Sequence, residues 1–341
     1  MRARTSLTLR PAHHRFHLPP TRAVRLLFVG DLMCMRSDRV PEVCSELHSL
    51  VRRADLVIGN CEAPVVGDCP RPDARYLFRF QMAEAYLASL LDRLGVETRR
   101  CALSVANNHI GDHGAAGLSE TLRRLRGLGI IPVGVREGSD PSIRLEAGDV
   151  RISLTAWTRW MNRESPVAGV GVWRAREIDR FGSHAREGSA TRARADLRIA
   201  FPHWDLEFRH FPSAETTRSA RRLAAAGFDL IVGHHPHVLQ PVEWLAGSVC
   251  LYSVGNLNGP TALLRSWPSR MLGAFEVEVS AAGPRRGQIT AYRLHRFAQR
   301  RTRSGVRLSS LSELAPRVRR RLEQRSGMLY PGPSSQTPVR P

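Results

Sequence analysis

Histidine residues crowd the end of one apolar run in this sequence. The stretch IVGHHPHVLQ at 231–240 places three histidines within four positions, directly after the apolar residues of 229–232. Imidazole groups bind metal ions and transfer protons near neutral pH. Because side chains two positions apart on an extended backbone point to the same side, we expect His235 and His237 to share a side and His234 to face the other way. The spacing predicts a metal-binding or catalytic role for His235 and His237, with His234 as a core or supporting residue.

Other polar side chains stand directly after apolar runs elsewhere in the chain. In α/β proteins, ligands collect in the crevice outside the carboxyl ends of the strands, so residues at these positions meet at one edge. Each motif alone has a simpler interpretation, such as a turn at Gly30-Asp31 or a helix cap at Asn60. Together they supply the groups of a metal site. The set comprises Asp31, Asn60, Glu62, Asn107, Asn108, His109, His203, Asp205, His234, His235, His237 and Asn256.

The elements that must position these residues follow from the alternation of apolar runs with helical stretches. Short apolar runs predict strands that are buried on both faces, and their alternation with helices is typical of βαβ units. The sequence therefore predicts an α/β fold. Strands are expected at 24–29, 55–58, 101–105, 130–133, 198–201, 229–232, 249–253 and 274–279, and helices at 41–53, 83–94 and 115–128.

The alternation changes after residue 143. The stretches 143–146 and 151–155 flank Gly148-Asp149, which predicts a hairpin and therefore a second sheet or an antiparallel edge. The Arg-rich stretch 182–197 is expected to form a solvated helix.

Both ends of the chain lack apolar periodicity, whereas the 341-residue sequence is long enough to bury a sizeable core. We therefore expect a disordered basic arm at 1–22, a single domain at 23–326 and a disordered tail at 327–341.

Charge and cysteine content restrict the class of protein. The net charge of +20 comes from arginine, because the sequence contains no lysine. A positive field favours anionic partners, but no nucleic-acid-binding motif accompanies it, so we expect no nucleic-acid partner. The six cysteines form no C-x-x-C pair, which favours a reducing compartment over a zinc–thiolate site. No apolar run reaches the roughly 18 residues that cross a bilayer, so we expect a cytoplasmic protein without a membrane partner.

Six short motifs follow one another in order: GD at 30–31, GNxE at 59–62, ANNH at 106–109, HW at 203–204, GHHPHVLQP at 233–241 and YSVGN at 252–256. In this order the chain resembles the CapA-type, poly-γ-glutamate-capsule branch of the calcineurin-like metallophosphatases. The resemblance implies a four-layer α/β/β/α sandwich and makes His109 the acid–base histidine, for which Asp112 is a candidate partner. It implies that the metal ligands are Asp31, Glu62, Asn108, His203, His235 and His237.

Two positions depart from the family pattern. Met33 stands where classical metallophosphatases carry a second metal-binding histidine, so one cation loses a nitrogen ligand. The remaining oxygen-rich set suits a hard divalent cation such as Ca²⁺, Mg²⁺ or Mn²⁺, and a single ion is one interpretation. Asp205 stands where CapA-like proteins carry glycine, and beside His203 it is expected to raise the basicity of the imidazole.

Two His/Asp pairs beside a cation indicate proton transfer. The pairs His109–Asp112 and His203–Asp205 could remove and return a proton next to a carbonyl, while the cation stabilises the enolate oxygen. In this respect the chain is similar to the lasso-peptide epimerases that invert a C-terminal tryptophan. The resemblance implies a metal-dependent peptide epimerase with a ribosomally made precursor peptide as its partner.

Several alternatives stay open. A metallophosphoesterase and a CapA-type capsule biosynthesis protein share the implied fold, and a binding module with a relict site is a third interpretation. His203 remains a candidate for either a ligand or a base. His295, in the stretch AYRLHRF at 291–297, lies beyond the motifs and is more often structural, but we include it as a candidate catalytic residue.

Overall fold

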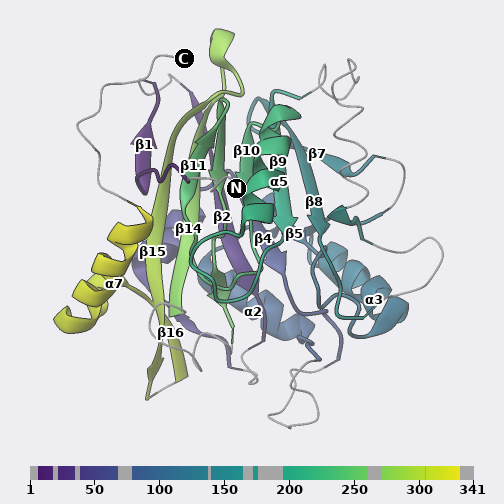
Figure 1. The fold of residues 1–341 in the computed structure, drawn as a ribbon. Helices are drawn as coiled ribbons and strands as arrows, with labels where there is room; N and C mark the ends of the chain where they lie inside the picture. Colours follow the sequence, from purple (N-terminus) through teal and green to yellow (C-terminus); the bar gives the residue numbers. More distant parts are fainter. Residues whose placement is uncertain are drawn as a thin grey trace.

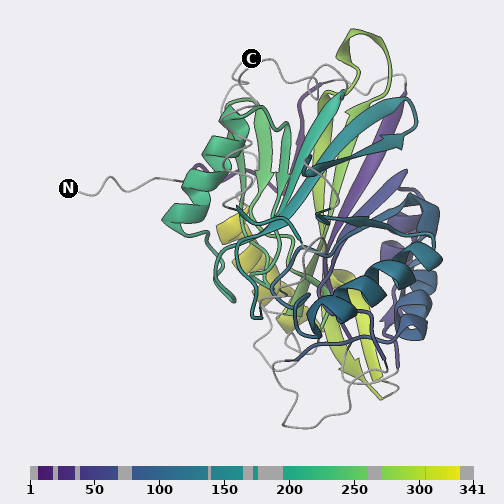
Figure 2. The ribbon, with the colours of Figure 1, turned by 90° about the vertical axis from the view of Figure 1, so that its right-hand side faces the viewer.

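Two β-sheets pack face to face, and helices cover the outer face of each sheet (Figures 1 and 2). The computed structural model describes residues 7–17, 22–34, 39–67, 79–136, 140–163, 172–175, 195–259, 270–303 and 305–330. The arrangement is the four-layer α/β/β/α sandwich that the sequence motifs imply.

The larger sheet has ten strands in the order β3-β16-β15-β14-β13-β2-β4-β5-β6, with β1 paired to β15 outside this path. Strands β2, β4, β5 and β6 are parallel, as βαβ alternation predicts, so their carboxyl ends lie at one edge. The strands are β1 (His13–Arg15), β2 (Ala23–Leu32), β3 (Glu42–Val43), β4 (Leu56–Cys61), β5 (Cys101–Ser104), β6 (Ile131–Val133), β13 (Asn256–Asn258), β14 (Met271–Ser280), β15 (Ile289–Thr302) and β16 (Gly305–Ser310).

The smaller sheet has six strands in the order β11-β12-β10-β9-β8-β7. Its central strands β8, β9, β10 and β12 are parallel, and β7 and β8 form the predicted hairpin. The expectation of a second sheet is therefore confirmed. The strands are β7 (Ser142–Ala147), β8 (Val150–Thr158), β9 (Leu197–His203), β10 (Leu230–Val232), β11 (Val242–Leu245) and β12 (Ser248–Leu251).

Three apolar layers hold the sandwich together. The central layer lies between the sheets, and residues such as Phe28 of β2 and Phe201 of β9 meet there with ring centroids 6.0 Å apart. A second layer joins the larger sheet to α1 (Ser45–Arg52), α2 (Glu84–Leu94) and α3 (Gly114–Gly127). A third joins the smaller sheet to α5 (Ala214–Ala225). Each fully buried leucine, valine or phenylalanine in these layers stabilises the fold by roughly 1.5–3 kcal/mol relative to exposure.

The helices follow the expected one-sided pattern. In α2 the buried residues Leu87, Leu90, Leu91 and Leu94 recur at the spacing that faces one side of a helix. Helix α5 begins after Ser213, whose side chain accepts a hydrogen bond from the Thr216 amide. Among the residues described, no helix combines the length and apolar character needed to span a bilayer. The short 3₁₀ helices are Thr98–Arg100, Gly283–Arg285 and Leu311–Glu313.

Residues 7–17, which we call the N-terminal strap, pack against both sheets, although we expected a disordered arm at 1–22. Strand β1 pairs with β15 of the larger sheet, and Arg10 forms a β-bridge with Val242 of the smaller sheet. The ring of Phe16 lies 5.1 Å from that of Trp244, and the Arg10 guanidinium lies 4.2 Å above the same Trp244 ring. For residues 7–17 the prediction is wrong, because their partners lie more than 200 residues away and leave no local signal. Residues 1–6 and 18–21 lie outside the described ranges.

The carboxyl end also differs from the expected tail at 327–341. Helix α7 (Pro316–Leu329) continues through the first three of these residues, and Leu329 and Tyr330 are buried against the central apolar layer. The Tyr330 hydroxyl donates a hydrogen bond of 2.6 Å to the Gln240 carbonyl. Residues 331–341 and most of the helix expected at 182–197 lie outside the described ranges, whereas 197 already belongs to β9.

Replacing Phe16 with alanine should destabilise the protein, because this ring contacts His14, Trp244 and Tyr292 across the two sheets. We expect a loss of about 1–2 kcal/mol for this half-buried ring, less than for a fully buried one. The measurement is the midpoint of urea unfolding. His13→Ala, an exposed position on the same strand, is the control and should change stability by less than about 0.5 kcal/mol. Equal effects of both substitutions would contradict a packed strap.

Candidate metal centre

The acidic residues of the candidate site come from the larger sheet. Asp31 in β2 pairs in register with Asn60 of β4 on one side and with Asn256 of β13 on the other. Glu62 follows β4 directly, and its amide donates a hydrogen bond of 3.0 Å to the Leu32 carbonyl. The Asn60 side-chain amide donates to Asp31 Oδ1 at 2.8 Å and also to the Glu62 carboxylate. One amide therefore ties the two acids together.

A β-bulge directs Asp31 toward this edge. Phe28 pairs with Ile58 and Asp31 with Asn60, so two residues of β2 oppose one residue of β4. Gly30 occupies the bulge, and a Cβ atom there would lie only 1.7 Å from the Gly255 carbonyl oxygen. The glycine of the GD motif is thus required by the close approach of two backbones.

The histidines come from the smaller sheet, where β9 ends at His203 and three more follow β10. His235 and His237 have φ values of 97° and 57°, in the left-handed region that residues other than glycine seldom adopt. The backbone is therefore not extended, and the prediction that His234 faces away is wrong. His234 Nδ1 lies 2.8 Å from His203 Nδ1 and 3.5 Å from Asp31 Oδ1. The sequence contained no signal for this reversal.

Contacts between the two sheets close the cluster. His237 Nδ1 lies 2.9 Å from Asp31 Oδ2 and 2.8 Å from Asn256 Oδ1. His203 Nε2 donates a hydrogen bond of 2.9 Å to Asn108 Oδ1, from the loop that follows β5. All six predicted metal ligands therefore lie in one buried cluster, which also contains His234.

Burial disfavours the ionised form of both acids, but their pKa values shift in opposite directions. Burial alone would raise the pKa of Asp31, but hydrogen bonds and positive charge from His234 and His237 hold it well below its usual value. Burial, together with the negative charge of Asp31, raises the pKa of Glu62 well above its usual value. Without a further positive charge, the cluster favours one carboxylate over two.

The histidines also separate into two kinds. Burial lowers the pKa of His237, but its hydrogen bond to Asp31 and the charge of that carboxylate outweigh burial and raise the pKa to about 9. Burial and the charge of neighbouring imidazoles lower the pKa of His203 and His235 well below the usual value. His203 and His235 are therefore neutral near pH 7, which is the form that binds a metal ion.

Several buried polar atoms of this cluster lack a hydrogen-bond partner within the described ranges. Glu62 Oε1 and His235 Nδ1 are the clearest, and buried groups of this kind usually have a partner. The donor atoms of two groups lie within 4.8 Å of one another, and Glu62 belongs to both. Carboxylate oxygen and imidazole nitrogen atoms fit a divalent cation. The groups are Asp31, Glu62, His203 and His234, and Glu62, His235 and His237.

Met33, the departure from the family motif, lies in the outer apolar layer. Its side chain is buried against Gly259, and its carbonyl accepts a hydrogen bond of 2.7 Å from the Asn258 amide. A thioether in this position provides packing in that layer.

His109 and Asp112 form the predicted pair beside this cluster. His109 Nδ1 donates to Asp112 Oδ2 at 2.8 Å, and the Phe80 amide donates to the same oxygen at 2.7 Å. These bonds fix the orientation of the imidazole and leave Nε2 for another partner. His109 directly follows Asn108, the hydrogen-bond partner of His203.

Three half-buried aromatic residues surround the histidines, and we call them the aromatic rim: Phe80, Trp160 and Phe208. Phe80 stacks on His109 with centroids 3.8 Å apart, and Trp160 meets His235 edge-on at 4.6 Å. Phe208 lies 5.9 Å from His237. Sequence reasoning missed the rim, because single aromatic residues in loops have no characteristic spacing.

Asp205 makes contacts other than those expected. Its carboxylate accepts hydrogen bonds from the Ser213 amide at 3.1 Å and from Gln240 Nε2 at 3.2 Å. Asp205 itself has a φ of 70°, so the backbone turns directly after the β9 strand. The carboxylate thereby fixes the 205–213 loop to the segment that follows His237, and its catalytic role remains a prediction.

His295 is not brought into the cluster. It lies in β15 opposite Ala274, and its Nε2 lies 2.9 Å from Glu276 Oε2. Arg53, at the end of α1, binds the same carboxylate at 3.2 Å. Burial raises the pKa of Glu276, but these two partners outweigh it and lower the pKa to about 2. These three side chains form an ion-pair network beside the end of α1. A catalytic role for His295 stays a prediction.

Comparison with known proteins links this site to one family. The family model described as bacterial capsule synthesis protein PGA_cap matches residues 25–259. The PGA biosynthesis protein CapA of Bacillus subtilis is 26% identical over 289 residues, which cover 79% of this chain and 71% of that protein. The capsule biosynthesis protein CapA of Bacillus anthracis is 25% identical, covering 72% of this chain and 61% of that protein. The chain thus spans less than two thirds of the B. anthracis relative.

A solved structure has the same type of fold. The putative 5'-nucleotidase from Staphylococcus aureus aligns with 89% of this chain and 58% of its own, at a TM-score of 0.50 and 15% sequence identity. The fold is therefore of the metallophosphatase type. At this identity the likeness is limited to the fold.

A divalent cation should stabilise this protein, and Glu62→Gln should remove much of that effect, because Glu62 belongs to both donor groups. A cation at about a hundred times its Kd adds about 2.7 kcal/mol to the free energy of unfolding. The measurement is the melting temperature after dialysis against a chelator, with and without added Mn²⁺ or Ca²⁺. Glu243→Gln, a buried acid bonded to Tyr252 outside the cluster, is the matched control. Equal responses of the two variants would argue against a metal centre at Glu62.

Proposed function

We propose that this chain, which belongs to the bacterial capsule synthesis protein PGA_cap family, is a divalent-metal-dependent hydrolase of anionic substrates, in the first place phosphoesters. The observation that carries the proposal is the buried convergence of two acids and four histidines beside an oriented His/Asp pair. When bound, a cation held by these residues would stabilise negative charge on a phosphoryl oxygen.

The His109–Asp112 pair provides the proton for the leaving group. In its doubly protonated form, His109 keeps Nδ1–H bonded to Asp112 and can donate the proton on Nε2. The hydrogen bond to the Asp112 carboxylate prevents the ring from turning. The stacked Phe80 ring covers one face of His109 and limits the access of water.

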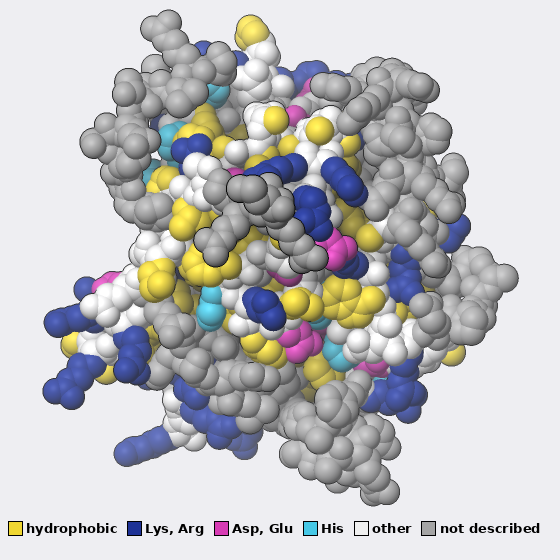
Figure 3. Space-filling model, in the orientation of Figure 1, with side chains coloured by type: hydrophobic (Ala, Val, Ile, Leu, Met, Phe, Trp, Pro, Cys, Tyr) yellow, Lys and Arg dark blue, Asp and Glu magenta, His cyan; other side chains and the backbone are white. Residues whose placement is uncertain are grey.

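The surface charge supports an anionic substrate. The chain has a net charge of +20, and arginine side chains are spread over the face of the molecule in Figure 3, where acidic side chains are fewer. Such a field attracts phosphates and carboxylates alike. Poly-γ-glutamate, which the name of the B. subtilis relative points to, is therefore a second substrate to test.

His109→Ala should lower the rate of phosphoester hydrolysis, because it removes the proton donor. We expect kcat for p-nitrophenyl phosphate or its bis-ester to fall by roughly 10²–10⁴-fold, with little change in the response of the melting temperature to metal. His48→Ala, an exposed histidine on α1, is the control. The assay uses Mg²⁺, Mn²⁺ and Ca²⁺ in turn, with poly-γ-glutamate as a parallel substrate. Unchanged kcat in His109→Ala, or no hydrolysis of any of these substrates, would reject the proposal.

One observation favours a second candidate, a metal-dependent peptide epimerase. Met33 leaves the centre with fewer nitrogen donors than a two-metal hydrolase has, so histidines remain for proton transfer. The comparisons do not show the expected resemblance to lasso-peptide epimerases. The expected His203–Asp205 pair is replaced in the structure by other contacts of Asp205. The second acid–base group would then be His237 with Asp31, and because the pKa of His237 is raised to about 9, it would act as the acid.

The epimerase candidate requires a precursor peptide as its partner and predicts exchange of one Cα proton with solvent. Incubating the protein with candidate peptides and metal in D₂O should add one mass unit at a single residue, and His109→Ala should abolish this. Mass spectrometry of the peptide is the measurement. Brisk phosphoester hydrolysis without any exchange would exclude the epimerase in favour of the hydrolase.

A further inference from the structure

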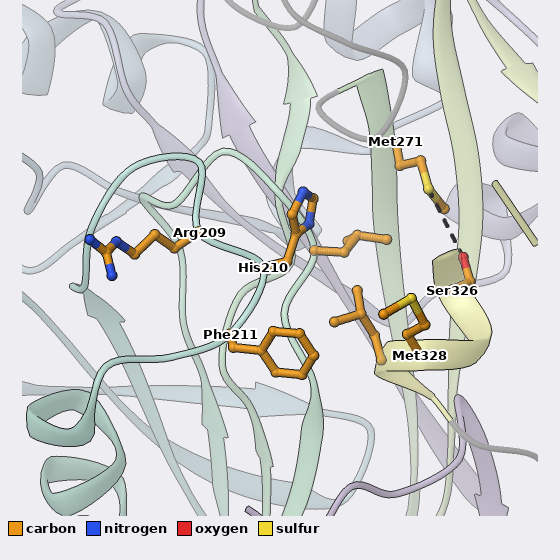
Figure 4. Close-up of a pocket in the computed structure, with 8 residues that line it drawn as sticks. Arg209, His210, Phe211, Met271, Ser326 and Met328 are labelled. Carbon is orange, nitrogen blue, oxygen red and sulfur yellow. Dashed lines mark hydrogen bonds between the residues drawn. The ribbon is translucent and has the colours of Figure 1, made fainter. Parts of the chain in front are cut away.

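An apolar pocket lies beside the metal centre, between the 205–213 loop and the end of α7 (Figure 4). Its volume is about 430 Å³, within the range of small-molecule sites. Figure 4 shows Phe211 facing Met328 across the gap, with Met271 and Ser326 on the far wall and Arg209 extending away. None of the cluster's carboxylates or histidines lines it, so it is a separate site.

Two residues that line this pocket, Phe211 and Met328, are exposed apolar side chains, whereas Leu239 and Met271 are buried. Phe211 is 43% and Met328 is 64% exposed, and with Leu206 they are the exposed large apolar side chains of the described residues. Grouped apolar exposure of this kind marks binding sites. Methionine side chains such as Met271 and Met328 adapt to ligands of different shape.

Two residues that line the pocket lie close in sequence or strand register to residues of the metal centre. Leu239 lines the pocket and follows His237 by two residues, so their Cα atoms are at most about 7.6 Å apart. Met271 precedes Leu272, which pairs in register with Asn256, a partner of His237. A short molecule whose apolar group contacts Leu239 could thus also contact the cluster.

We propose that this pocket binds the hydrocarbon group of the substrate, an aliphatic or aromatic chain attached to the anionic group held at the metal centre. The inference rests on the proposed function, because it assumes that the anionic end lies at the cluster. The substrate class is therefore an amphipathic ester or acid with an apolar group next to its charge. Phe211, Met271 and Met328 determine the preference for chain length.

Other occupants fit the pocket less well. A second copy of the chain carries the same net charge of +20, so the two copies repel each other. The sequence 331–341, PGPSSQTPVRP, has Val339 as its only aliphatic side chain apart from proline and offers little apolar surface. A stable protein partner buries about 800 Å² on each side, far more than one pocket of this size provides.

The test uses non-hydrolysable n-alkylphosphonates, from ethyl to octyl, with the full chain and Mg²⁺. In protein labelled with ¹³C at the methionine methyl groups, octylphosphonate should shift the Met271 and Met328 signals. The signal of Met82, which is buried in the outer apolar layer and does not line the pocket, should stay unchanged. By calorimetry, each added methylene should tighten binding roughly three- to fourfold until the pocket is full. The double variant Phe211→Ala, Met328→Ala should flatten this series. Leu206→Ala, exposed on the same loop outside the pocket, should retain it.

Three outcomes would overturn the proposal. The first is an affinity for alkylphosphonates that does not depend on chain length. The others are methionine signals that shift when residues 331–341 are removed but not when the ligand is added, and methionine signals that shift with protein concentration alone. The second would make the tail the occupant, and the third a second copy. Phosphoester hydrolysis without chain-length dependence would reject this inference alone. Chain-length-dependent binding without hydrolysis would reject the proposed function alone.

Discussion

The burial of two acidic side chains is the constraint on which the rest of the structure depends. Asp31 and Glu62 are fully buried, and an unpaired buried charge costs several kcal/mol. Their compensating imidazoles come from the other sheet, so the sheets must pack with their carboxyl ends aligned. The apolar layer between the sheets provides this alignment, and the bulge at Gly30 and the left-handed turns at His235 and His237 complete it.

Local sequence signals predicted much of this arrangement. Apolar runs predicted most of the strands. The rule that ligands collect at strand ends predicted that one set of side chains lies together: Asp31, Glu62, Asn108, His203, His235 and His237. The orientation of His234 was missed because it depends on backbone reversals that no residue pattern encodes. Strands β15 and β16 and the strap were not predicted, because their formation depends on pairing with strands that are distant in sequence. The bonding of Asp205 depends on a loop contact with Gln240 that spacing cannot reveal.

The family and the fold restrict the possible reactions of this site but do not determine which one it catalyses. The same cluster suits hydrolysis at phosphorus or proton transfer at carbon, because both need a cation beside an oriented acid–base group. Features outside the cluster could distinguish the two reactions, among them the aromatic rim that surrounds the histidines. Substrate contacts outside the cluster therefore carry the information about which reaction takes place.

The N-terminal strap has a consequence for synthesis on the ribosome. Its residues leave the ribosome before either sheet is made, and the strand that pairs with β1 follows roughly 280 residues later, which takes about 15–60 s at typical elongation rates. Until then Phe16 cannot contact both of its ring partners, Trp244 and Tyr292. The strap can dock only after both sheets exist, so it is made before them but reaches its native position after them.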